Sequence, residues 1–596
     1  MGTGFTIDTP LKVARFGVPS VISLVDDKLI ERMRKYYCGV HGEPYSEIAD
    51  REEDARSRRI TAYLNLVNRI VDRQTRELAA QDFTDDSDLT RYFEMLDGAS
   101  CLKQKYLGMR SMAEGPEKEK SRTWLRQQVI PGAIDVNIMT KADRENLRDG
   151  VKLTREYSDA MAALRGFASS DLRSAVVFSA GLNLPLYGYV AEFADFRQQP
   201  DGSFRKTVTL KVSDFRSAHV QAKIFAKKGI WVSEYRIESG LNCGGHAFPT
   251  EGLLLGPILD EFNVKRDALA AELFEIYRKA AAEKYGLAPS EPPAVRVTAQ
   301  GGVGTACEHR FLLKYYRLDS VGWGSPFLLV PEATTVDDET LVKLARADAD
   351  DIRLTSSSPL GVPFYSLKNS ASEVTRDTRI KSNKPGSPCV SKYLAMNTEF
   401  GEPLCPASFR YQSQKIRQLD TLGLLPSEYA RQQRKIVEKA CICRELGDGV
   451  MMKYGMKEDQ KALSPAVCPG PNLAYFSKVV SLRDMIGHIY GELNVLGERE
   501  KLRPNLFVNE AKLYVDYLRN RLLEGFPSPT DREKVYFAEF RKNLLSGIEY
   551  YARLTREWTA ETRESTETFL HELERLKEEL ESMSLAFRPA FAASPA

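Results

Sequence analysis

The sequence predicts an α/β fold: a (β/α)8 barrel with a helical insertion after the first strand and a helical, cysteine-rich C-terminal extension. Short apolar, β-prone runs recur between residues 13 and 355, helical patterns separate most of them, and several runs end in glycine-rich turns. Alternation of strands and helices is typical of parallel sheets. A doubly wound open sheet is the alternative, but no G-x-G-x-x-G follows the first strand to favour it.

Eight runs are predicted as strands. The first, with its loop, lies within 13–25, and Asp26 can cap the helix that follows it through Met33. The others are 133–139, 174–179, 207–212, 229–235, 295–299, 320–323 and 351–355. Eight strands fit a barrel whose loops at the C-terminal strand ends face the substrate.

Changes in composition divide the chain into three parts. The predicted barrel covers 1–385 and contains a charged, helix-rich insertion at 46–128. A cysteine-rich segment follows at 386–500, and 501–596 has apolar residues at helical spacing. We expect that last part to be helical.

Bulk composition indicates a globular protein. The 596 residues are 43% hydrophobic and 28% charged, with a net charge of only +2, which argues against nucleic acid or an acidic membrane as the main partner. No apolar run is long enough for a membrane span, and no secretory signal is recognised at the N-terminus. Nine cysteines without regular spacing do not indicate a disulfide framework, so we expect a cytoplasmic protein.

The stretch 238–249 follows a β-prone run and contains Gly244-Gly245-His246. Adjacent glycines allow positive φ and let a planar ligand approach the backbone. His246 could serve as an acid or base near neutral pH. The alternative interpretation is a plain turn with a histidine on the surface.

Two further glycine-rich turns indicate a phosphate site. One is Gln300-Gly301-Gly302-Val303-Gly304-Thr305, and the other is Gly324-Ser325-Pro326-Phe327. Loops after late barrel strands often bind phosphate through free backbone N–H groups. Tight strand-to-helix turns are the alternative.

These turns resemble those of a known family. The sequence is similar to the FMN-dependent nitronate monooxygenase and FabK-type enoyl-ACP reductase group, formerly called 2-nitropropane dioxygenase-like, over about residues 1–380. Five segments keep the family's order: Asp135-Val136-Asn137-Ile138, Asn242-Cys243-Gly244-Gly245-His246, Ala299-Gln300-Gly301-Gly302-Val303, Trp323-Gly324-Ser325-Pro326-Phe327-Leu328 and 361–369. Pro326 stands where the family has an arginine.

The resemblance implies an FMN-dependent oxidoreductase acting on a small organic substrate. It implies FMN with its phosphate on Gly301, Gly302, Gly324 and Ser325. Asn137 would lie near the flavin, and His246 would transfer the proton. Gly244, Gly245, Val303 and Trp323 complete the expected cofactor contacts. The resemblance does not identify the substrate.

Five cysteines fall in the segment after the predicted barrel, and the sequence suggests a [4Fe-4S] cluster on Cys405, Cys441, Cys443 and Cys468. Cysteine followed by proline, as at Cys405 and Cys468, is frequent at cluster ligands. Zinc and scattered buried thiols are the alternatives, and Cys389 could replace Cys405. A cluster would let an external donor such as ferredoxin reach the flavin.

A second functional class is also compatible with the sequence. The chain could be a non-catalytic flavin- or metal-bearing scaffold that docks through its C-terminal helices. The highly charged helix expected at about 559–583 most often has a solvated face, and a partner helix is the second interpretation. The sequence leaves open whether the chain forms a homo-oligomer.

Overall fold

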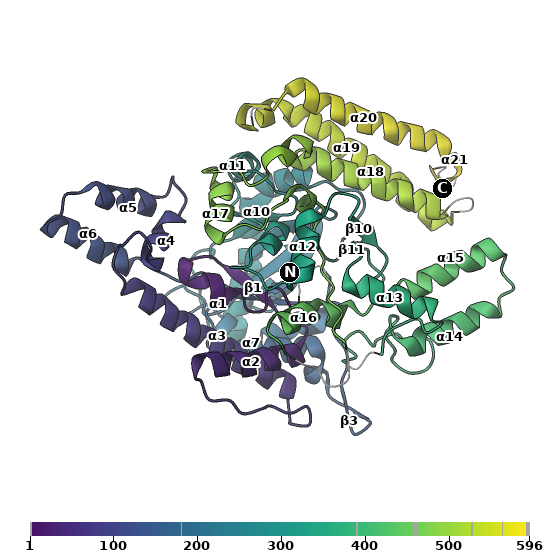
Figure 1. The fold of residues 1–596 in the computed structure, drawn as a ribbon, viewed down its shortest axis with the longest axis horizontal. Helices are drawn as coiled ribbons and strands as arrows, with labels where there is room; N and C mark the ends of the chain where they lie inside the picture. The colour runs from purple at the N-terminus through teal and green to yellow at the C-terminus, as the bar shows by residue number, and fades with distance from the viewer. Residues whose placement is uncertain are drawn as a thin grey trace.

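The computed structural model describes residues 3–179, 181–388, 391–456, 462–525, 529–562 and 564–591, which form a mixed α/β structure with a helical C-terminal region (Figure 1). Its centre is a seven-stranded parallel sheet in the order β1-β2-β5-β6-β7-β8-β9. The strands are β1 (Ser20–Ser23), β2 (Ile134–Ile138), β5 (Ala175–Phe178), β6 (Thr207–Val212), β7 (Val232–Glu238), β8 (Arg296–Gln300) and β9 (Ser320–Gly322).

The sheet is a half-barrel that does not close, so the predicted complete barrel is wrong. Seven of the eight predicted strands enter the sheet, but β10 (Ile352–Thr355) pairs antiparallel with β11 (Phe364–Leu367) instead. A parallel partner requires a crossover of about a dozen residues or more, and the stretch 356–363 suits a hairpin. Strands β9 and β1 therefore remain the two edges of the sheet.

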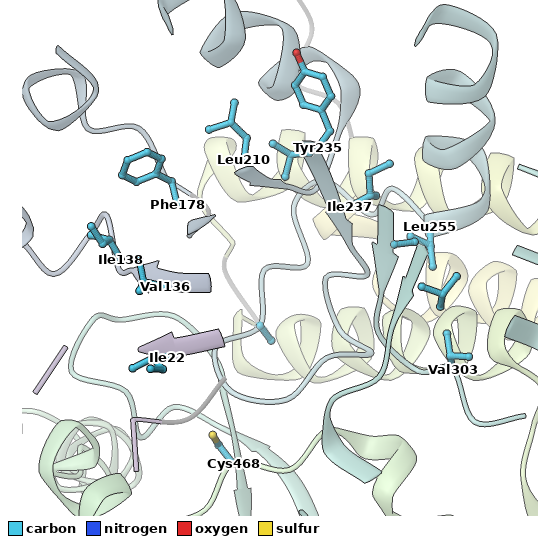
Figure 2. Packing of buried hydrophobic residues seen from close by; sticks show 14 of the residues in the cluster. Ile22, Val136, Ile138, Phe178, Leu210, Tyr235, Ile237, Leu255, Val303 and Cys468 are labelled. Carbon is cyan, nitrogen blue, oxygen red and sulfur yellow. The ribbon is translucent and has the colours of Figure 1, made fainter. Parts of the chain in front are cut away.

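The two faces of the sheet differ in polarity because side chains alternate along each strand. The register aligns buried apolar residues of neighbouring strands on one face, as Val136, Phe178, Leu210 and Ile237 illustrate (Figure 2). Helices that follow the strands pack against it. These helices are α7 (Asp159–Ala168), α9 (Phe215–Lys227), α10 (Leu255–Tyr285) and α11 (Ala306–Tyr315).

The opposite face, which we call the inner face, is polar. It carries charged, amide and hydroxyl side chains on four strands, and ion pairs join several of them, as between Arg236 and Glu234 at 2.9 Å. Its members are Asp135, Asn137, Lys211, Glu234, Arg236, Glu238, Thr298 and Gln300.

Helices at the N-terminal side extend from the sheet (Figure 1). The cap predicted for the first long helix is present, because Asp26 accepts the Leu29 N–H at 2.9 Å. The start of the stretch predicted as the first strand is helical, because α1 ends at Val13 and a 3-10 turn covers Ala14–Phe16. The helices are α1 (Thr9–Val13), α2 (Asp27–His41), α3 (Ala55–Ala79), α4 (Asp88–Glu94), α5 (Cys101–Ser111) and α6 (Pro116–Gln127), of which the last four occupy the predicted insertion.

Smaller elements complete the first 385 residues. A two-stranded hairpin follows β2, one short helix follows β5, and two helices flank the β10–β11 hairpin. They are β3 (Leu147–Arg148), β4 (Val151–Lys152), α8 (Leu184–Val190), α12 (Asp338–Arg346) and α13 (Ala371–Lys381).

The C-terminal region is helical, as expected. Helices α18, α19 and α20 pack on one another and on α10 and α11, and they share one hydrophobic core with the sheet (Figure 1). Their apolar faces are thus already buried within this chain. The helices are α14 (Phe409–Asp420), α15 (Pro426–Val437), α16 (Ile442–Lys453), α17 (Leu482–Tyr490), α18 (Leu506–Gly525), α19 (Asp531–Thr562), α20 (Thr566–Ala586) and α21 (Arg588–Phe591). In the described ranges, every helix is too short or too polar to cross a bilayer.

Candidate functional site

The glycine turns after β7 and β8 lie against each other. A methyl group added to Gly301 would stand 2.6 Å from the Cys243 sulfur, and one added to Gly302 would overlap the Asn242 side chain. Gly302 also has φ +81°, a conformation that side-chain-bearing residues rarely adopt. Both glycines are therefore required for contact between the two turns.

A segment from the C-terminal region joins the third turn to this pair. The Gly470 N–H donates to the Ser325 hydroxyl at 2.7 Å. A methyl group on Gly470 would lie 2.9 Å from the Gly244 nitrogen, and one on Gly244 would lie 2.5 Å from the Cys468 carbonyl oxygen. We call residues 468–472 the strap. The strap contacts the turn after β7 and the turn after β9. The turns after β7 and β8 therefore meet directly, and the turn after β9 is joined to them through the strap.

The β10–β11 hairpin holds His246 in place, and its first strand, β10, is the run that was predicted as the eighth barrel strand. The backbone of β11 and the residue before it pairs with the segment around His246. The Tyr365 N–H donates to Gly245 O and the Ala247 N–H donates to Pro363 O, both at 2.9 Å. The imidazole Nε2 lies 2.7 Å from Ser358 Oγ, and the ring packs edge-on against Phe364 with centroids 5.0 Å apart.

The environment of His246 keeps its ring neutral. Burial, together with the nearby charges of Lys211 and Lys141, lowers its pKa to about 4. Nδ1 has no hydrogen-bond partner in the described part of the chain. At pH 7 the residue is therefore a neutral imidazole, and in the tautomer whose Nε2–H donates to Ser358 Oγ, Nδ1 carries the free lone pair of a general base.

An ion pair lies beside the histidine on the inner face. Lys211 Nζ is 2.9 Å from Glu238 Oε2, and the Gln300 amide donates to Glu238 Oε1 at 2.9 Å. Burial opposes ionisation, but these two partners keep the Glu238 pKa below its ordinary value. Burial and the Glu238 charge raise the Cys243 pKa well above its ordinary value, so Cys243 is a thiol and a poor nucleophile.

Asn137 lies on the inner face at the C-terminal end of β2. The residue is only 7% exposed, and its Oδ1 has no hydrogen-bond partner among the described residues. Buried polar atoms are normally paired, so an unpaired amide oxygen here is unusual. It is suited to accept a hydrogen bond from a ligand.

The first turn of α11 is not available for a phosphate. Glu308 Oε2 accepts the N–H groups of Gly304 at 2.8 Å and Thr305 at 3.2 Å, and Arg503 Nη1 lies 2.6 Å from Glu308 Oε1. Both side chains of this ion pair are almost fully buried. The protein's own carboxylate thus occupies the position that an anion would take at this helix terminus.

Trp323 is fixed between two histidines. Its indole N–H donates to His309 Nδ1 at 3.0 Å, and its ring packs edge-on against His488 with centroids 5.8 Å apart. Burial lowers the pKa of His309 to about 4, so that nitrogen remains an acceptor at neutral pH. Gly324, next in the chain, is exposed and has open space where a side chain would stand.

The four cysteines predicted to hold an iron–sulfur cluster do not all lie together. Cys405, Cys441 and Cys443 are buried in one small apolar cluster, whereas Cys468 belongs to the main core and lies over Gly245. Within the described ranges, no three His, Cys, Asp or Glu side chains are placed to share a metal ion. The structure therefore gives the cluster no support. Cys389 lies outside the described residues.

The expected FMN contacts fit the structure in part. In the described part of the chain, the N–H groups of Gly302 and Gly324 have no acceptor outside the sheet ladder, and Asn137 Oδ1 has no donor. These groups suit a phosphate and the N–H edge of a flavin ring. The Ser325 hydroxyl already accepts a hydrogen bond from the strap. The groups that suit FMN lie in the glycine turns, because Glu308 occupies the first turn of α11.

Sequence reasoning missed several residues that shape this site. Glu238 and Lys211 stand at strand ends with their side chains on the inner face, a position that the alternation along β6 and β7 could have indicated. Only the cysteine of the strap was considered, although Pro469-Gly470-Pro471 indicates a rigid turn. The pair Glu308–Arg503 spans 195 positions and left no local signal.

Comparison with known proteins adds little. No protein-family model matches the chain, and no curated protein matches it. A solved structure of a FabK mutant from Thermotoga maritima is similar, with 13% sequence identity and a TM-score of 0.29, covering 66% of this chain and 85% of that one. At this identity and TM-score, no functional conclusion follows from the likeness.

Proposed function

We propose that the protein is an FMN-dependent oxidoreductase acting on a small organic substrate, with His246 as the residue that transfers the proton. The observation that carries this proposal is the meeting of the Gly244 and Gly301 turns beside a half-buried, neutral imidazole. The resemblance of the turn sequences to FMN enzymes supports the choice of cofactor.

FMN would contact three parts of this edge. Its phosphate would accept from backbone N–H groups of the turns at Gly301-Gly302 and Gly324, of which those of Gly302 and Gly324 have no acceptor outside the sheet ladder among the described residues. Asn137 Oδ1 would accept from the flavin ring. When bound, FMN supplies the exchange of an electron pair with the substrate, and the protein supplies position and proton transfer.

His246 would hold the proton at Nδ1. Its Nε2 is engaged by the Ser358 hydroxyl, which also accepts the Leu360 N–H at 3.2 Å and is therefore oriented itself. A placed base of this kind contributes about 10²- to 10⁴-fold to a rate. We expect His246→Ala to lower substrate-dependent flavin reduction by that factor while FMN binding is retained.

The first test is direct. The full-length protein is purified, its visible absorption spectrum is recorded, and FMN is titrated into any colourless preparation. Saturable binding with a flavin spectrum is expected. A colourless protein that takes up no FMN would end the proposal.

A matched pair of variants tests the placement of the phosphate. Gly324→Ala puts a methyl group into open space at the proposed phosphate position, and Gly98→Ala does so at a remote turn. We expect only Gly324→Ala to weaken FMN binding, while the unfolding free energy of both stays within about 0.5 kcal/mol of wild type. Equal FMN affinities would contradict this placement.

A further inference from the structure

The side chain of Lys141 is held in a defined position at the same edge of the sheet. Lys141 follows β2, and its aliphatic stem lies on Gly181, where an added methyl group would be 2.8 Å from Lys141 Cε. Its ammonium lies 4.7 Å from the centre of the Phe248 ring, which belongs to the histidine loop. A flexible lysine is thus fixed between the loops after β5 and β7.

This ammonium has no counter-charge. Within the described ranges no carboxylate pairs with Lys141, and desolvation is the cause that lowers its pKa. Lys211, in contrast, is neutralised by Glu238. Both ammonium groups depress the pKa of His246, so both act at the imidazole. Two cations and one carboxylate leave an excess positive charge beside His246.

A second feature of the same strand end also lacks a partner. Asn137 stands on β2 four positions before Lys141, and its buried Oδ1 has no donor among the described residues. An unpaired buried acceptor is costly in a folded protein without a ligand, whereas Lys141 is exposed and its ammonium stays open to solvent and to a ligand. Together they indicate that a ligand reaches this end of β2.

We propose that Lys141 binds an anionic group of the substrate, a carboxylate or a phosphate, and so orients the substrate toward His246. An ammonium forms strong, charge-assisted hydrogen bonds with such groups. The reaction itself, and the hydrogen bond from the flavin ring to Asn137, rest on the proposed function, but the anion site at Lys141 does not. The flavin phosphate is assigned elsewhere, because its turn follows β8, and three strands separate β8 from β2 in the sheet.

The test uses FMN-loaded protein titrated with sodium succinate and with inorganic phosphate, followed by the flavin absorption spectrum. We expect saturable changes for wild type, and a dissociation constant about 10- to 100-fold larger for Lys141→Met and Lys141→Gln. Lys141→Arg should recover part of the affinity. Lys279→Met, an exposed position on α10, is the control. Equal affinities for Lys141→Met and the control would overturn the assignment.

Two further measurements separate the outcomes. If the protein takes up no FMN, the same anions are tested by thermal unfolding against sodium chloride of equal ionic strength, and wild type should be stabilised more than Lys141→Met. FMN and riboflavin affinities are also compared in both proteins. A loss in Lys141→Met for FMN alone would assign the ammonium to the cofactor phosphate and overturn its role in substrate binding.

Discussion

Replacing Arg503 by methionine should destabilise the protein strongly. Arg503 is 4% exposed and Glu308 3% exposed, and two of its nitrogens contact the Glu308 carboxylate at 2.6 and 2.9 Å. The guanidinium also donates to Gly302 O and to Asn472 Oδ1, both at 2.7 Å. One side chain thus joins the strap, the β8 turn and the first turn of α11.

The expected cost follows from what the substitution leaves behind. Removing one partner of a buried ion pair costs about 3–5 kcal/mol, because the other charge stays buried and unpaired. Glu308 would still accept N–H groups of Gly304, Thr305 and Leu506, which limits the loss. We therefore expect about 3 kcal/mol, which corresponds to about a 150-fold change in the unfolding equilibrium.

Urea unfolding followed by tryptophan fluorescence measures this loss. Arg575→Met, which breaks an exposed pair with Glu572, is the control and should cost less than about 1 kcal/mol. Adding Glu308→Gln to Arg503→Met should restore part of the stability, because an amide costs less to bury than a charge. A loss in Arg503→Met no larger than in the control would refute the reasoning.

Three more predictions concern the site and its support. Burial raises the pKa of Glu510 to about 7 from an ordinary 4.5, so stability should fall by about 3 kcal/mol between pH 4.5 and 7, and Glu510→Gln should flatten this profile in pH-dependent melts. Gly470→Ala should cost about 1–3 kcal/mol in urea unfolding, because its methyl group meets the β7 turn, and Gly98→Ala should be neutral. Flavin turnover that depends on neutral His246 should stay level from pH 8 to 5 and fall near pH 4.

Local patterns identified the strands and the glycine turns. Seven predicted strands pair in the sheet because short apolar runs bounded by turn residues report burial directly. The glycines at 244, 301 and 302 were recognised from a different local signal. Each stands where another part of the chain approaches the backbone closely, and only glycine tolerates that contact.

Other features could not be read from the sequence. The run 352–355 has a strand pattern, but periodicity does not specify the partner, and here the partner is β11, which is close in the chain. Similarly, the cysteine pattern suggested one metal site, yet cysteine is also a small hydrophobe. Cys468 packs over Gly245 while Cys441 and Cys443 lie in a separate apolar cluster.

The sequence by itself determined where backbone conformation is constrained: strand positions, helix caps such as Asp26, and the turns that require glycine. These depend on neighbours within a few residues. Only the tertiary structure decided that the barrel stays open, that the strap reaches Gly244, and that Glu308 meets Arg503. Such contacts join segments hundreds of residues apart, and the free energy of each depends on burial and distance, which no local pattern encodes.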